Sequence, residues 1–117
     1  MGHLRIKRIY ESADPDDGRR VLVERLWPRG VSKERARLDL WLKQVAPSPE
    51  LRKWYHHEPE RWPEFQRRYL AELEDHPEVV ENLRNLLSDG DVTLVYGAVT
   101  EQNSAAVLAQ FLRNRAP

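Results

Sequence analysis

The sequence predicts an α/β fold in a single domain over residues 1–117, with a small, mainly parallel sheet of about three strands and about five helices. Two observations predict this class. The apolar spacing is strand-like near residues 4–10, 20–26 and 92–98, and it is helical through most of the chain between the second and third of these segments. So much helix between two strands favours a parallel crossover connection between them.

Composition excludes several classes of protein. Nineteen basic and nineteen acidic residues cancel, so no net charge draws the whole molecule to nucleic acid or to an anionic membrane. The absence of cysteine excludes disulfides, thiolate nucleophiles and zinc–thiolate sites, and it fits a reducing compartment. No apolar run approaches the roughly 18 residues of a membrane span. We therefore expect a cytoplasmic protein without a membrane partner.

The strands differ in how far they are expected to be buried. Leu4 and Ile6 alternate with basic residues, which is typical of a strand with one wet face, and a Pro- and Gly-containing turn follows at 14–18. The second strand carries the apolar run 21–23. The third, 92–98, is almost entirely apolar, and we expect it to be the central strand, covered on both faces.

The helices are predicted from apolar stripes and from end signals. After Ser32, an i, i+3, i+4, i+7 spacing at Leu38, Trp41, Leu42 and Val45 predicts an amphipathic helix that Pro47 ends. Ser48 and Pro49 begin a short helix that runs through Tyr55. Further helices are predicted after Pro59, over 79–87, and after Asn103 as N-cap.

Polar side chains follow the second and third strands where each ends. Because ligands of open α/β sheets bind beyond the carboxyl ends of strands, these groups predict one crevice. Its expected ligand-binding residues are Arg25, Trp27, Arg29, Tyr96, Glu101 and Asn103. The two arginines would clamp a small phosphate- or carboxylate-bearing ligand, Trp27 would form a wall, and Glu101 would accept a proton if there is chemistry.

Each of these residues also has a structural interpretation. Arg25 pairs with a neighbouring glutamate, Trp27 closes the sheet edge, and Asn103 only caps its helix. His57 is a second candidate acid or base, but adjacent histidines diverge and no His-Glu-x-x-His spacing exists, so we predict no metal site. No phosphate loop, dinucleotide motif or nucleophile elbow is present. The cofactor and any catalysis therefore stay unassigned.

The basic loop 25–33 supports a second class of function. In this alternative the chain is an interaction module, and the loop contacts a protein or a nucleic acid. A concave pocket beyond the strand ends would favour the first class, whereas a flat basic patch would favour the second.

Several segments resemble the YeaO-like family of small bacterial proteins, a domain of unknown function. The similarity lies in 20–30, including the Arg-Leu-Trp-Pro-Arg-Gly run, in 46–54 with His57, in 65–73, in 94–96, and in 102–108. It implies a compact α/β domain in a bacterial cytosol and no established reaction. The chain departs from the family at Val99, near which members often carry a lysine. A ligand touching that lysine in relatives would be bound differently here.

Overall fold

The computed structural model describes residues 2–56, 58–98 and 103–114, and its centre is a sheet of four parallel strands in the order β1-β4-β2-β3. The strands are β1 (Leu4–Arg8), β2 (Arg19–Leu22), β3 (Leu40–Trp41) and β4 (Val92–Tyr96). The α-helices in the described ranges are α1 (Lys33–Ala36), α2 (Pro49–Tyr55), α3 (Trp62–Asp75), α4 (Pro77–Asp89) and α5 (Ser104–Asn114). The predicted α/β class is confirmed, with four strands instead of three.

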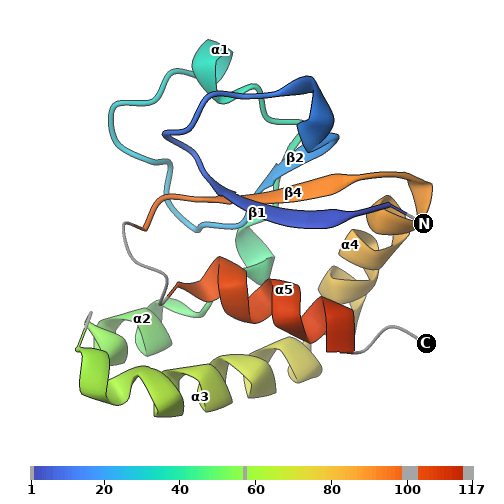
Figure 1. The fold of residues 1–117 in the computed structure, drawn as a ribbon. Coiled ribbons are helices and arrows are strands. Elements are labelled where there is room, and N and C mark those ends of the chain that lie inside the picture. The colour runs from blue at the N-terminus through green and yellow to red at the C-terminus, as the bar shows by residue number, and fades with distance from the viewer. Residues whose placement is uncertain (1, 57, 99–102, 115–117) are drawn as a thin grey trace.

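β4 is an inner strand, as its apolar sequence predicts. It pairs with β1 on one side and with β2 on the other, so that Val92 faces both Leu4 and Arg19 (Figure 1). Residues 92–95 have no exposed surface. A strand in this position needs apolar or hydrogen-bonded side chains on both faces, which explains its nearly continuous apolar run.

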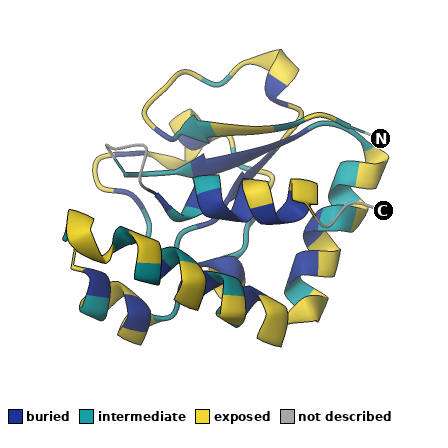
Figure 2. Ribbon diagram, turned by 60° about the horizontal axis from the view of Figure 1, so that its bottom comes forward, coloured by how far each residue is buried: buried dark blue, intermediate teal, exposed yellow. Residues whose placement is uncertain are grey.

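The two faces of the sheet are covered differently. Helices α2 to α5 lie on one face (Figure 1). They build the larger core, whose buried residues include Leu94, Leu108 and Tyr69. Loop segments and the single turn of α1 cover the other face, over a smaller cluster that includes Leu22 and Val95. Figure 2 shows that the outward sides of α3 and α4 are the exposed ones, as expected of amphipathic helices.

The prediction of a helix over 38–45 is wrong. Ser32 does begin a helix, but α1 ends at Ala36, and the chain then forms β3 and a 3-10 turn, Lys43–Val45. The helical spacing has another origin. Leu38 and Trp41 pack against the smaller cluster, whereas Leu42 and Val45 pack into the larger core. The segment passes the sheet edge and contributes to both sides of it.

Helices α2 and α5 begin at the predicted caps. The Ser48 hydroxyl accepts the backbone N–H of Leu51 at 3.1 Å, with Pro49 in the first helical position. The Asn103 side chain accepts the N–H of Ala106 at 2.9 Å. These caps fix where α2 and α5 begin. The amino-terminal ends of both helices lie on the side of the sheet where β2 and β4 end.

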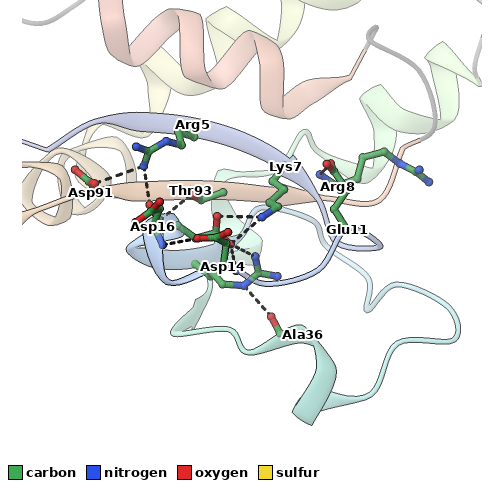
Figure 3. A network of polar contacts seen from close by, with 11 residues as sticks. Arg5, Lys7, Arg8, Glu11, Asp14, Asp16, Ala36, Asp91 and Thr93 are labelled. Carbon is green, nitrogen blue, oxygen red and sulfur yellow. Dashed lines mark hydrogen bonds and ion pairs between the residues drawn. The ribbon is translucent and has the colours of Figure 1, made fainter.

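At the opposite end of β2, the turn 14–18 builds a buried polar network (Figure 3). Asp17 accepts hydrogen bonds from Lys7 at 3.1 Å and from Arg20 at 2.7 Å, and its backbone oxygen accepts the Thr93 hydroxyl. Gly18 has φ +64°, and a Cβ there would lie 2.3 Å from the Asp91 carbonyl oxygen, so only glycine fits. The network joins β1, β2 and β4 through Lys7, Arg20 and Thr93.

Candidate functional site

A pocket of about 300 Å³ lies beyond the carboxyl ends of β2 and β4, where the sequence predicts a crevice. We call it the strand-end pocket. Glu24 follows β2 by two residues, Ala98 follows β4 by two, and α2, α3 and the start of α5 supply the other walls. The side chains used below come from its lining: Glu24, Arg52, Lys53, Tyr55, His56, Trp62, Phe65 and Asn103.

Glu24 is the acidic group of the pocket. Burial raises the pKa of its carboxyl above the ordinary value, and this effect outweighs the opposite effects of the Arg52 charge and of a hydrogen bond from the Gly97 backbone N–H. Its own backbone oxygen accepts Nε1 of Trp41 at 2.6 Å, which fixes the main chain at this point. The half-buried carboxylate is thus only partly compensated by the Gly97 N–H and the Arg52 charge.

Two cations lie at the rim of the pocket, on α2. Arg52 and Lys53 are exposed, and no carboxylate forms a close ion pair with either of them within the described ranges. The helix that carries them is held to α3, because the Glu72 carboxylate accepts both the backbone N–H of Ser48 at 2.8 Å and its hydroxyl at 2.6 Å. The rim therefore presents two positioned positive charges to solvent.

The end of α2 adds a histidine and a tyrosine. His56 takes a left-handed conformation, φ 44°, and its N–H closes the helix onto the Arg52 carbonyl at 3.0 Å. Tyr55 is buried, and burial raises the pKa of its hydroxyl. Both residues line the pocket, so the chain reversal after α2 shapes its wall.

Aromatic rings form one side of the pocket. Trp62 stacks on Phe65 with ring centroids 5.4 Å apart and an angle of 16° between the planes, and Tyr55 lies 4.6 Å from Phe65. Phe65 and Tyr55 belong to the core, whereas Trp62 is half-buried and lines the opening. The rings thus serve both packing and the lining of a cavity.

Of the residues predicted to bind a ligand, Asn103 lines this pocket, and it is buried. Arg25 lies beside the pocket instead. Its guanidinium donates to the carbonyls of Pro47 at 2.9 Å and Ala46 at 3.3 Å, two residues of the pocket wall. Arg25 thereby holds the wall in place and has fewer donors left for a ligand.

The other predicted residues lie elsewhere. Trp27 donates to the Val31 carbonyl at 2.7 Å and packs edge-to-face on Trp41, in the smaller cluster. Arg29 is exposed, and its carbonyl accepts the Tyr10 hydroxyl. Tyr96 packs against the larger core. The structure does not bring these three side chains into the strand-end pocket, and their ligand-binding role stays a prediction.

His57, Val99 and Glu101 lie outside the described residues. Within the described ranges no group of three metal-ligating side chains is present, and no helix is long and apolar enough to cross a membrane.

Sequence reasoning missed Glu24 and Arg52. The signal for Glu24 was the same rule that selected Arg25, since both follow the second strand. Arg52 lies in the segment 46–54 that carries the family similarity.

The comparisons with known proteins agree on one family. The sequence model of one protein family, the inactive DUF488-N3 subclade, matches residues 3–116. An uncharacterized protein of Mycobacterium tuberculosis (strain H37Rv) and one of Mycobacterium bovis are each 50% identical over 113 residues, which cover 96% of this chain and 95% of theirs. The uncharacterized Escherichia coli protein YeaO is 43% identical, over 96% of this chain and 98% of its own. No solved structure matches.

Proposed function

The chain belongs to the inactive DUF488-N3 subclade, together with its YeaO-like relatives, and we propose that it binds a small anionic ligand in the strand-end pocket. The observation that carries the proposal is the position of Arg52 and Lys53, two exposed cations without a close ion pair in the described part of the chain, at the rim of a concave site. Phosphate and carboxylate groups are the ligands that such cations recognise.

Two further features support an anion at this place. The first turn of α5 directs backbone N–H groups and a partial positive charge toward the carboxyl ends of the strands, where Ser104 lines the pocket. The pocket is concave, which favours ligand binding over the interaction module that the basic loop 25–33 suggested. The subclade is described as inactive, which favours ligand binding without catalytic turnover. The setting we propose is the bacterial cytoplasm.

The proposal is tested by calorimetric titration with inorganic phosphate and with ribose 5-phosphate. We expect the double variant R52A/K53A to lose about tenfold or more in affinity, since two charge-assisted contacts are removed. The matched control is R29A/K33A, which removes the same charge from two exposed positions of the basic loop. Equal loss in both variants would indicate unspecific attraction, and loss in the control alone would move the site to the loop.

A further inference from the structure

We propose that the ligand of the strand-end pocket is a guanine nucleotide, with Glu24 reading the edge of the base. This inference rests on the proposed function and adds the identity of the ligand to it. Three chemically different parts of the pocket have to be explained together: a half-buried acceptor, an aromatic wall and a cationic rim.

Glu24 calls for hydrogen-bond donors on the ligand. An ionised carboxylate offers about four lone-pair sites on two oxygens, and the Gly97 N–H occupies one of them. An anion without N–H groups would bind at the cationic rim and leave these lone pairs unused. A ligand that also contacts Glu24 must therefore bring N–H groups as well as its negative charge.

Guanine provides these donors in the required arrangement. Its Watson–Crick edge carries a ring N–H beside an exocyclic amino group, so two parallel donors meet the two oxygens of a carboxylate, as they do in a guanidinium–carboxylate pair. Adenine presents an acceptor at the ring position and is rejected. Hypoxanthine keeps the ring N–H but lacks the amino group, and it should bind with one contact fewer.

The aromatic wall suits a planar base. Trp62 is half-buried, and its ring is already stacked on Phe65, so its position is fixed before a ligand arrives. Indole rings of this kind are common stacking surfaces for nucleobases. A sugar phosphate or a dicarboxylate would leave this surface unused.

The rim completes the match. In the proposed arrangement the base stacks on Trp62 with its edge toward Glu24, and the phosphate extends to Arg52 and Lys53, which line the same pocket. A volume of about 300 Å³ lies at the small end of ligand sites, which fits one nucleotide rather than a dinucleotide. Guanosine 5′-monophosphate and a single-stranded guanine with its 5′-phosphate share this chemistry.

The experiment compares the affinities of guanosine, inosine and adenosine 5′-monophosphates and ribose 5-phosphate for the full chain by calorimetry. We expect the guanosine nucleotide to bind about tenfold or more tightly than the other three. E24Q replaces one acceptor oxygen by an NH₂ donor, so it should bind the guanosine and inosine nucleotides equally and keep its affinity for ribose 5-phosphate. E60Q, at an exposed position outside the pocket, is the control.

The outcomes separate this inference from the proposed function. If ribose 5-phosphate binds through Arg52 and the wild type shows no preference for guanine, the anion site stands and the guanine assignment fails. If none of the four probes binds, both fail. A pentanucleotide with one guanine distinguishes the source: tighter binding than the free nucleotide, together with a steep loss of affinity with added salt, assigns the site to single strands. Wild-type selectivity decides the question even if E24Q does not fold.

Discussion

Asp17 and Glu24 are carboxylates at opposite ends of β2, and the fold places them in opposite environments. Burial would raise the pKa of Asp17, but hydrogen bonds from the Asp14 N–H, Lys7 and Arg20 together lower it below the ordinary value. Burial dominates at Glu24, and its pKa is raised. The difference lies in the number of donors supplied by the protein.

The comparison distinguishes a structural charge from one that is available to a ligand. Asp17 holds three strands together and has its partners within the fold (Figure 3). Glu24 faces a cavity, and the Arg52 charge acts on it without a close ion pair among the described residues. The network around Asp17 is therefore expected to determine stability, and the carboxyl ends of β2 and β4 to determine binding.

The largest expected effect is at Asp17. D17N leaves the buried charge of Arg20 and the half-buried charge of Lys7 without their counterion, and we expect a loss of about 3–5 kcal/mol in the free energy of unfolding at neutral pH. Because the folded pKa is lowered, this stabilisation is present above the ordinary value of 3.8 and is lost as pH falls through the folded pKa.

Urea denaturation across pH measures this effect at Asp17, with D16N at the exposed neighbour as control. A D17N protein as stable as the wild type would show that the network contributes nothing to stability.

Arg25 tests whether a residue beside the pocket behaves like Asp17. R25A removes the donors to the Ala46 and Pro47 carbonyls, and we expect a loss of about 1–3 kcal/mol. R29A, an exposed arginine of the same loop, should change stability by less than about 0.5 kcal/mol. Thermal and urea unfolding compare the two variants. Unchanged stability in R25A, with lost phosphate binding, would instead make Arg25 a ligand clamp.

E24Q should change stability in the direction opposite to D17N. The raised pKa means that the wild type loses stability as pH rises from the ordinary value of 4.5 through the folded pKa. The variant lacks this titration, so it should gain relative to the wild type with rising pH, by up to about 1 kcal/mol. Denaturant midpoints at acidic and neutral pH measure the gain. A loss at neutral pH would mean that Glu24 is paired like Asp17.

The smallest effect is expected at the rim. R52A removes an exposed guanidinium that forms no close ion pair with a described carboxylate, so unfolding should change by less than about 0.5 kcal/mol while phosphate affinity falls. Parallel unfolding and binding curves test this separation. A large destabilisation would assign Arg52 to the fold.

The sequence predicted what depends on local chemistry and missed what depends on tertiary contacts. Residue type alone predicted the helix caps Ser48 and Asn103, and a continuous apolar run predicted the buried strand β4. The segment after α1 has helical spacing only because it crosses a sheet edge between two clusters. The position of the pocket was predicted from the carboxyl ends of the strands. The hydrogen bonds of Arg25 could not be predicted in this way, because they join it to carbonyls 21 and 22 residues further along the chain.

The strand order has a consequence for biosynthesis. β4 lies between β1 and β2 but is made after both, so these two early strands have no sheet neighbour in common until the ribosome has released the region around residue 96. The nascent chain must keep two strand edges unpaired while α2, α3 and α4 emerge. Insertion of β4 then completes the sheet in one late, long-range step, and the start of α5 supplies the last wall of the strand-end pocket.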